Sequence, residues 1–227
     1  MKEGIKISEE DAILLEAQTR EQGGCDRNQW QLAREWRLTS SHFGEIIKTT
    51  DQRDMDIFCK SMYSPKNLNH VPSIRHGQTY ESIALEKFSE LTGKKVLKSG
   101  FCVRPDLDYL GASPDSFVQD ESAVVEVKCP FVGRNCKITP GGKKFPFLEM
   151  IGDKISLKRT HNYYYQVVGQ MYLSKKETAY FCVYTYKDFV YEKITLDEEF
   201  FKSTMLPKLK DFYNNVYCPY VASVLKQ

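Results

Sequence analysis

The chain has 227 residues, of which 41% are hydrophobic and 13% aromatic, and its formal net charge is +2. This content is enough for one buried core, so we predict a single domain over residues 1–227. No apolar run reaches the ~18 residues of a membrane span and the first residues lack an apolar signal core, which excludes an integral membrane protein. We expect an intracellular, soluble protein, cytoplasmic in a prokaryote or phage and nuclear in a eukaryote.

The cysteines and histidines form no metal-binding motif. The seven cysteines include no Cys-x-x-Cys pair and the four histidines are scattered, so the common zinc spacings are excluded. The odd number of cysteines is typical of reduced thiols.

Two short helices are predicted at the amino terminus. Ser8 and Asp11 have the spacing of a capping box and predict a helix that the glycine pair at positions 23 and 24 stops. Asn28 is a suitable cap for a second helix over residues 29–36. We treat residues 1–29 as a helical extension of the domain.

Hydroxyl side chains gather at the predicted start of a third helix, in Arg37-Leu-Thr-Ser-Ser41. The unpaired backbone amides and the positive dipole end of a helix favour an anion, so a phosphate would fit there. Arg34 and Arg37 precede this point and would add positive charge. The alternative is that Thr39 or Ser40 simply caps the helix while both arginines are solvated.

Two longer helices follow. Residues 54–63 predict one helix, and Arg75 opens another that stops at Gly93. The Pro and Asn content of residues 64–72 predicts a loop between them.

Glu81 is a charged residue on an apolar face of the second of these helices. Ala84 and Phe88 lie three and seven residues after it and share this face. A carboxylate left buried and unpaired there would cost several kcal/mol, so it needs a cation or a donor, such as metal-bound water or Lys128. The alternative is an exposed Glu81 that only favours the helix dipole.

A β-hairpin is predicted between Gly111 and Pro130, after a strand over residues 95–103. Ser116-Phe-Val and the run from Ala123 are β-prone, and the polar Gln-Asp-Glu-Ser between them predicts a turn. The two-residue period of the second strand divides it into an apolar face and a face that carries opposite charges.

The hairpin brings Asp115 beside Glu126 and Lys128. Two carboxylates and one ammonium at the edge of an apolar sheet suit a hard cation such as Mg²⁺, which takes oxygen ligands and keeps several waters. The alternative is an ordinary surface ion pair on a strand.

Residues 131–161 are unusually basic. They carry seven Lys and Arg against two acidic residues, a charge of +5 that leaves −3 for the rest of the chain. A solvated flexible loop is the default for this composition. We predict a basic flap or insert that faces a polyanion, since clustered Lys and Arg supply salt-dependent affinity for phosphates.

The next helix carries polar groups on one face. Tyr163, Gln166 and Gln170 share a stripe, while Val167 and Met171 fall on another. The alternative is an ordinary aromatic-rich core helix.

The carboxyl-terminal third completes the fold. Residues 178–186 and 189–196 predict a second hairpin that extends the sheet. Asp197 caps a closing helix that Pro207 is expected to kink or split.

Several of these motifs together resemble a known family. Pro-Asp115, a spacer and Glu126-x-Lys128 resemble the core of the PD-(D/E)xK nucleases. Gly-Ala-Ser-Pro-Asp with Val-Glu-Val-Lys-Cys-Pro is similar to their lambda-exonuclease-like branch, the YqaJ-type viral recombinases. The resemblance runs from about Trp30 to Tyr217. It implies an α/β fold with a restriction-endonuclease-like core, a mixed central β-sheet flanked by helices.

The resemblance implies a catalytic centre. Asp115, Glu126 and the backbone carbonyl of Val127 would hold Mg²⁺, with Mn²⁺ as a substitute. Glu81, which matches the Gly-x3-Glu-x2-Ala pattern, would bind a second metal ion or orient water. Lys128 would polarise the attacking water or stabilise the charged phosphorane.

The resemblance also implies a site for a DNA end. Trp30-x3-Arg34-x4-Thr-Ser-Ser41 and Tyr163-x2-Gln166-x3-Gln170 match family patterns that contact the 5′ phosphate and the DNA end. The candidate side chains are Arg34, Ser41, Ser113, Tyr163, Gln166 and Gln170, with Arg37 as an extra candidate.

The implied activity is exonuclease digestion of one strand of linear double-stranded DNA, from a phosphorylated 5′ end towards the 3′ end, in recombination or end resection. The resemblance implies that the protein assembles as a homotrimer and acts with a single-strand-annealing protein. It implies no binding to a membrane.

Three departures from the family concern the hairpin and the flap. Ser116 stands where glycine often follows Pro-Asp, the spacer from Asp115 to Glu126 is about one residue longer than usual, and the segment from Arg134 to Lys158 is expanded. Two other functions stay open: a structure-specific or restriction-like endonuclease, and a catalytically inactive DNA-binding module.

Overall fold

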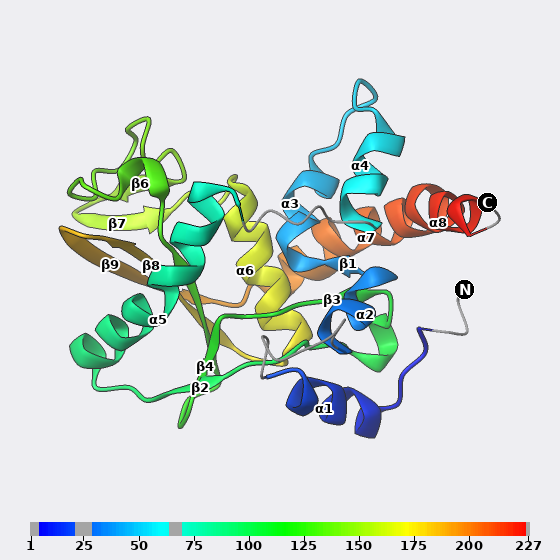
Figure 1. Ribbon diagram of the computed structural model, residues 1–227, viewed down its shortest axis with the longest axis horizontal. Helices are drawn as coiled ribbons and strands as arrows, with labels where there is room; N and C mark the ends of the chain where they lie inside the picture. The colour runs from blue at the N-terminus through cyan, green and yellow to red at the C-terminus, as the bar shows by residue number, and fades with distance from the viewer. Residues whose placement is uncertain (1–4, 21–28, 64–69, 226–227) are drawn as a thin grey trace.

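The computed structural model describes residues 5–20, 29–63 and 70–225 (Figure 1). The glycine pair expected to stop the first helix, the Asn28 cap and residues 64–69 of the expected loop lie outside these ranges.

A five-stranded mixed sheet forms the centre of the fold, with the order β2-β4-β5-β8-β9. Its strands are β2 (Val96–Lys98), β4 (Ser116–Val118), β5 (Ala123–Lys128), β8 (Thr178–Thr185) and β9 (Asp188–Thr195). β5 and β8 pair in parallel, and the other neighbours are antiparallel. The predicted α/β class, the mixed central sheet and both hairpins are confirmed.

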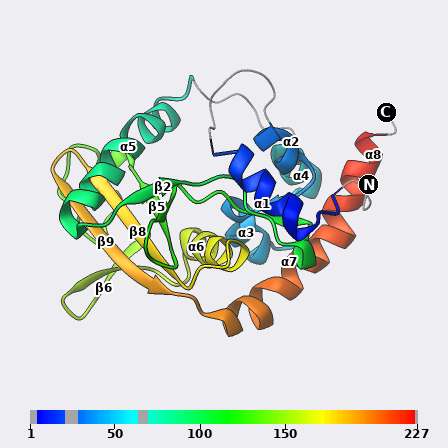
Figure 2. The same cartoon turned by 90° about the horizontal axis from the view of Figure 1, so that it is seen from below.

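Helices cover both faces of this sheet. Those before it are α1 (Glu9–Gln18), α2 (Gln29–Glu35), α3 (Ser40–Ile47), α4 (Met55–Tyr63) and α5 (Pro72–Thr92), and α6 (Asn162–Leu173) crosses between β5 and β8. α5 lies on one face and α6 on the other, and α6 also packs against α3 (Figures 1 and 2). None of the described helices combines the length and apolar content that crossing a bilayer requires.

The helix boundaries follow local chemistry. The Ser8 side chain accepts a hydrogen bond from the Asp11 amide, as the capping-box spacing predicts. α5 begins at Pro72, three residues before the predicted start, because a first-turn residue needs no amide hydrogen. It ends where Gly93 takes a φ of +70°, a conformation that favours glycine.

β5 is buried on both faces, so the predicted charged face is not exposed to solvent. Val124 packs in the cluster beneath α6, while Val125 and Val127 pack with Ala84 of α5. Only 2% of the Glu126 surface is exposed. The carboxylate therefore depends on protein groups or a bound ion, not on bulk water, for its stabilisation.

The predicted strand over residues 95–103 is shorter than expected. The Gly100 amide donates to Glu16 Oε1 at 2.9 Å and the Phe101 amide to Thr19 Oγ1 at 2.7 Å. These bonds hold the chain against α1 instead of the sheet. A short parallel pair, β1 (Leu38–Thr39) with β3 (Leu110–Gly111), was not expected from the sequence.

The basic segment at 131–161 is anchored to the core and is not the solvated loop of the default interpretation. It contains the hairpin of β6 (Leu148–Ile151) and β7 (Lys154–Leu157). Ile138, Phe145 and Phe147 of this segment are buried in the main hydrophobic cluster. Its orientation towards DNA stays a prediction.

The chain ends in a long helical run. Wider helical turns at Phe200–Met205 and Tyr213–Tyr217 alternate with α7 (Leu206–Phe212) and α8 (Cys218–Val224). Pro207 lies in the first turn of α7, directly after a wider turn. The interruption expected at Pro207 is therefore a change in the helical hydrogen-bonding pattern, and the helical run continues through this residue.

Candidate active site

Asp115 is fixed opposite β5 by two hydrogen bonds. Its amide donates to the Val125 carbonyl at 3.2 Å, and its Oδ2 accepts from the Val127 amide at 2.6 Å. Ser116, the next residue, pairs with Val125 across the hairpin. The sequence motif thus places the Asp115 carboxylate beside the strand that carries Glu126 and Lys128, as predicted.

The Glu126 carboxylate is enclosed by donors from two elements. Gln166 Nε2 donates to Oε1 at 2.7 Å, and Gln170 Nε2 donates to Oε2 at 2.6 Å. Lys128, two residues along β5, forms an ion pair with Oε1. Because Gln166 and Gln170 are one turn apart on α6, the predicted polar stripe of this helix faces the carboxylate.

A pocket of about 210 Å³ opens above these groups. Its walls are formed by Gly77, Glu81, Val127, Lys128, Cys129, Pro130 and Tyr163. Lys128 Nζ lies 4.5 Å from the centre of the Tyr163 ring and 3.4 Å from Gln166 Oε1. The structure therefore gathers Glu81 from α5, Val127 and Lys128 from β5, and Tyr163 from α6 around one opening.

Burial and mutual repulsion shape the protonation of the acidic groups. Burial raises the pKa of Asp115 well above its usual range, and the charges of Glu126 and Glu81 raise it further. Burial and the Glu126 charge likewise raise the pKa of Glu81. For Lys128, burial lowers the pKa, but the Glu126 and Asp115 carboxylates outweigh it and the net shift is upward. The site therefore holds a charged ammonium beside three crowded carboxyl groups, whose ionised forms repel one another.

This crowding of carboxyl groups fits a divalent cation, whose charge would favour their ionised forms. Within residues 5–20, 29–63 and 70–225, no three His, Cys, Asp or Glu side chains are already arranged around one point. A closed zinc-type cage is not formed by these residues, whereas Mg²⁺ takes one or two carboxylates and keeps its waters. Asp115 Oδ2 accepts a hydrogen bond from the Val127 amide, whereas Oδ1 accepts none from another described residue and is available as a metal ligand.

A second polar region adjoins the carboxylates. Trp30 Nε1 donates to Ser113 Oγ at 3.0 Å, and the Arg34 guanidinium stacks 4.2 Å above the Trp30 ring. Gln170 Nε2 also reaches the Ser113 carbonyl, at 3.3 Å. A continuous path of contacts thus joins Arg34 to Glu126.

Arg34 lacks an acidic partner among the described residues. Burial lowers the pKa of its guanidinium to about 10, a value at which it keeps its charge at neutral pH. A half-buried guanidinium without a counter-ion is a site for an anion.

The sequence matches the family model for the YqaJ-like viral recombinase domain over residues 29–177. The chain belongs to this family. The resemblance drawn from its motifs is confirmed. No protein with a curated function matches the sequence.

Solved structures share the fold of this YqaJ-like domain. An alkaline exonuclease from Laribacter hongkongensis is 19% identical, covers 87% of this chain and 96% of its own, and has a TM-score of 0.63. The shutoff and exonuclease protein of Kaposi's sarcoma-associated herpesvirus, SOX, is 14% identical, with 93% and 74% coverage and a TM-score of 0.59. A phage-related exonuclease from Haemophilus somnus is 13% identical, with 84% and 96% coverage and a TM-score of 0.57.

Arg37 of the YqaJ-like domain is not placed at the anion site. Its guanidinium donates to the carbonyls of Asp108 at 2.7 Å and of Ala33 and Ile5 at 2.8 Å each. Only 8% of its surface is exposed. Arg37 joins α2 to the N-terminal segment and to the loop before β3, which corrects the expectation that its side chain contacts a DNA end.

Ser41 lies at the start of α3, as predicted, but the structure gives it no contact with Arg34. It is exposed, and its Oγ lies 3.1 Å from Thr39 Oγ1. The Thr39 side chain makes no capping hydrogen bond, which corrects the capping alternative for that residue. The first amides of α3 therefore have no side-chain cap from Thr39.

Trp30 has a role in the YqaJ-like domain that sequence reasoning missed. The sequence assigns Trp30 no role beyond its place in the family pattern, yet its indole connects Ser113 to Arg34. The four-residue spacing between Trp30 and Arg34, which stacks the two side chains on one helix face, was the available signal.

Proposed function

We propose that this YqaJ-like domain is a Mg²⁺-dependent exonuclease that hydrolyses phosphodiester bonds of linear double-stranded DNA. The observation that carries the proposal is the group of Asp115, Glu126 and Lys128, joined through β5, of which Lys128 lines a pocket together with Glu81. The fold shared with exonucleases supports it. The Laribacter enzyme has also been solved with dAMP, and SOX with DNA and with RNA.

Asp115, Glu126 and the Val127 carbonyl would hold the metal ion, with Mn²⁺ as a substitute for Mg²⁺. When bound, the ion would polarise the phosphoryl group and lower the pKa of a water ligand. Glu81, whose pKa is raised by burial and by Glu126, would orient the attacking water from the opposite wall.

Lys128 is better suited to stabilise charge than to accept a proton. The upward shift of its pKa keeps the ammonium protonated at neutral pH. It would therefore donate to a phosphoryl oxygen as negative charge develops there. Tyr163, whose ring lies beside the ammonium, limits the positions that it can take.

The direction of digestion is proposed from the second polar region. Arg34, Ser113 and Ser41 would bind a 5′ phosphate, and Gln166 and Gln170 would link that end to the catalytic carboxylate. Digestion would then run from 5′ to 3′, in recombination or end resection. A homotrimer and an annealing partner are proposed from family resemblance alone.

The decisive experiment compares three duplex substrates. Linear DNA with a 5′ phosphate, linear DNA without it and closed circular DNA are incubated with Mg²⁺, Mn²⁺ or EDTA. We expect metal-dependent loss of the phosphorylated linear DNA from its 5′ end. Nicking of the circle would favour an endonuclease, and DNA binding without cleavage in either metal would identify an inactive binding module.

Arg34→Gln is expected to remove the preference for a 5′ phosphate. A charge-assisted contact contributes roughly 1.5–3 kcal/mol, so kcat/KM on phosphorylated ends should fall about 10- to 100-fold. Unphosphorylated ends should be cleaved at nearly the wild-type rate. Arg104→Gln is the matched control, because Arg104 also stacks on an aromatic ring, 4.6 Å above Tyr172. Equal losses on both substrates would contradict the assignment.

Gly77→Ala should separate stability from activity. A Cβ at Gly77 would meet nothing within 4 Å, and alanine favours a helix interior over glycine by about 0.5–1 kcal/mol. We expect Tm to rise while kcat falls, since the methyl group projects at the wall of the catalytic pocket. Thr79→Ala, on the exposed side of α5, is the control. A larger side chain, in Gly77→Leu, that left kcat unchanged would contradict the role of this wall.

A further inference from the structure

Aromatic rings gather between α5 and the end of β8, next to the catalytic pocket. The Tyr80 ring lies 6.0 Å from that of Tyr184, nearly parallel at 19°, and 4.9 Å from that of Tyr186. We call Tyr80, Tyr184 and Tyr186 the aromatic platform. His76 supports it from within, 4.6 Å from Tyr80, and its Nδ1 lies 3.4 Å from the Tyr186 hydroxyl.

The platform is not part of a closed core. Tyr186 is 44% exposed and lies just beyond the end of β8, while Tyr80 and Tyr184 are half-buried. His76, by contrast, is buried at 7% exposure. The rings thus have a packed side towards His76 and an open side towards solvent, which leaves ring surface available for a ligand.

The platform is continuous with the proposed catalytic pocket. On α5, His76 and Tyr80 each directly precede a pocket residue, Gly77 and Glu81. On the opposite wall, Pro130 is followed by Phe131, whose ring lies 5.6 Å from His76. Because Gly77 has no side chain, no side-chain atom of that residue separates the pocket from the rings.

Charge favours a nucleic acid on the side nearest the pocket. The Arg134 guanidinium stacks 3.9 Å above Phe131, and the Arg134 carbonyl accepts the Tyr186 amide at 2.9 Å. The nearest acid in the turn is Asp188, whose carboxylate accepts the amides of Ile138 and Phe189. Arg134 is thus held beside the rings, while the neighbouring carboxylate is already satisfied.

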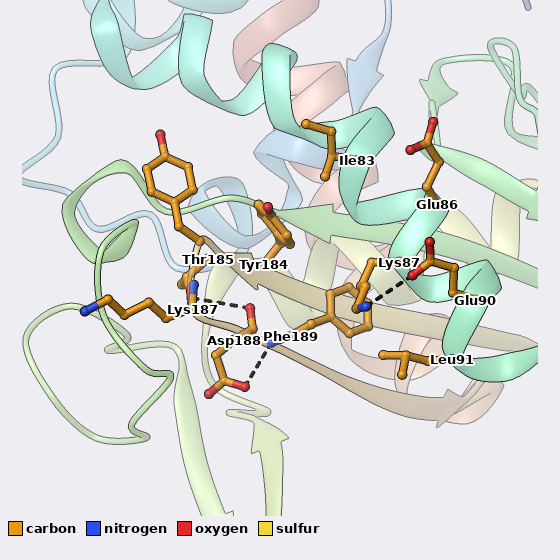
Figure 3. A pocket seen from close by; sticks show the side chains of 11 residues that line it. Ile83, Glu86, Lys87, Glu90, Leu91, Tyr184, Thr185, Lys187, Asp188 and Phe189 are labelled. Atoms are coloured by element: carbon orange, nitrogen blue, oxygen red, sulfur yellow. Dashed lines mark hydrogen bonds and ion pairs between the residues drawn. The ribbon is translucent and has the colours of Figure 1, made fainter.

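The charge changes beyond the platform. Tyr184 and Tyr186 line one end of a groove of about 490 Å³ that runs between α5 and the β8–β9 turn, and Glu86 and Glu90 lie farther along its α5 wall. Figure 3 shows Tyr184 facing this groove, Lys87 paired with Glu90, and Lys187 extending away from it. Acidic side chains would repel phosphates, so the favourable surface is limited to the rings beside the pocket.

We propose that the aromatic platform stacks unpaired bases of the DNA strand that flank the phosphodiester in the catalytic pocket. The location of this strand rests on the proposed function. Bases within a duplex have both faces occupied, so only unpaired bases can offer a face to Tyr186. Stacking on phenol rings tolerates any base, and Arg134 adds attraction for the backbone.

The test measures single-strand binding without cleavage. Wild-type protein in EDTA is titrated into fluorescein-labelled single-stranded oligonucleotides that carry 2-aminopurine at successive positions from the 5′ end. Quenching of 2-aminopurine at a few adjacent positions is expected, since stacked bases lose fluorescence. Tyr186→Ala should weaken binding by about fivefold or more and restore the 2-aminopurine fluorescence. Tyr186→Phe keeps the ring, so it should retain both the wild-type affinity and the quenching.

Tyr191→Ala is the matched control. Tyr191 is also 44% exposed, but its ring packs on Phe88 and Tyr180. Wild-type-like binding by Tyr186→Ala, or absence of single-strand binding and quenching in the wild-type protein, would overturn the platform. If Tyr80→Ala does not fold, Tyr186→Ala still decides, because its exposed ring can be removed without opening the core.

Cleavage of linear duplex DNA is measured separately with Mg²⁺. Protein that binds single strands through Tyr186 yet cleaves no DNA would refute the proposed function and retain the platform. Protein that cleaves DNA while Tyr186→Ala binds single strands normally would refute the platform alone.

Discussion

Glu126→Gln is expected to lower DNA hydrolysis by about 10³-fold or more while DNA binding is retained. The substitution removes the most buried carboxylate of the site, at 2% exposure, and with it a ligand for the metal ion. A loss of ~4 kcal/mol of transition-state stabilisation corresponds to this factor. Single-turnover cleavage and fluorescence anisotropy with end-labelled duplex would measure the two properties.

The Glu126→Gln protein should remain folded. Lys128 keeps the Asp115 and Glu81 carboxylates nearby, and the repulsion that raises the pKa of Asp115 is reduced. Glu121→Gln is the matched control, since this glutamate also pairs with lysines, Lys94 and Lys193, but at the turn of the hairpin. Unchanged turnover in Glu126→Gln would remove this residue from the mechanism.

Lys128→Met is expected to reduce both activity and stability. Hydrolysis should fall about 10²- to 10³-fold, the usual effect of losing one donor to a developing oxyanion. The free energy of unfolding should also fall, by about 3 kcal/mol, because the substitution leaves Glu126 and its neighbouring carboxylates without their ammonium. Chemical denaturation at neutral pH would measure the second effect.

A double substitution tests the cause of this instability. Glu126→Gln combined with Lys128→Met should be more stable than Lys128→Met alone, since removing a carboxylate relieves the unbalanced charge. Lys193→Met is the control, because this lysine pairs with Glu121 while 49% exposed, and surface pairs contribute ~1 kcal/mol or less. Additive losses in the double variant would show that Lys128 acts through packing instead.

The sequence was sufficient for the centre of this site because its geometry is local. Asp115 directly precedes β4 and Glu126 lies on β5, and a short polar turn joins these strands, so the two-residue period and the turn signal place the two residues together. Gln166 and Gln170 are one helical turn apart, which also follows from the sequence. Their contact with Glu126 needed only the docking of α6 against β5.

The features that were missed depend on contacts between distant segments. Arg37 resembled an anion ligand, yet its guanidinium binds the carbonyls of Ile5 and Asp108, residues that no periodicity brings near it. The Gly100 amide likewise donates to Glu16 of α1 and not to a neighbouring strand. Tertiary packing decides hydrogen bonds of this kind, and the pattern of residues in one sequence does not predict them.

The aromatic platform was missed for the same reason. Tyr80 reads as part of a helix and Tyr184 and Tyr186 as strand residues, and each is ordinary in that setting. Their stacking arises from the way α5 crosses the end of β8.

The parallel pairing of β5 with β8 also bears on how the protein folds during synthesis. Ala123 pairs with Thr178, and α6 must cross over before that pairing can form. Pairing between strands so distant in sequence is slow, because the entropy cost of closing a large loop precedes the favourable free energy of the contacts. A ribosome-bound chain that has not reached Thr178 therefore leaves one edge of β5 unpaired, and the nascent protein gains an ordered acidic centre only late in translation.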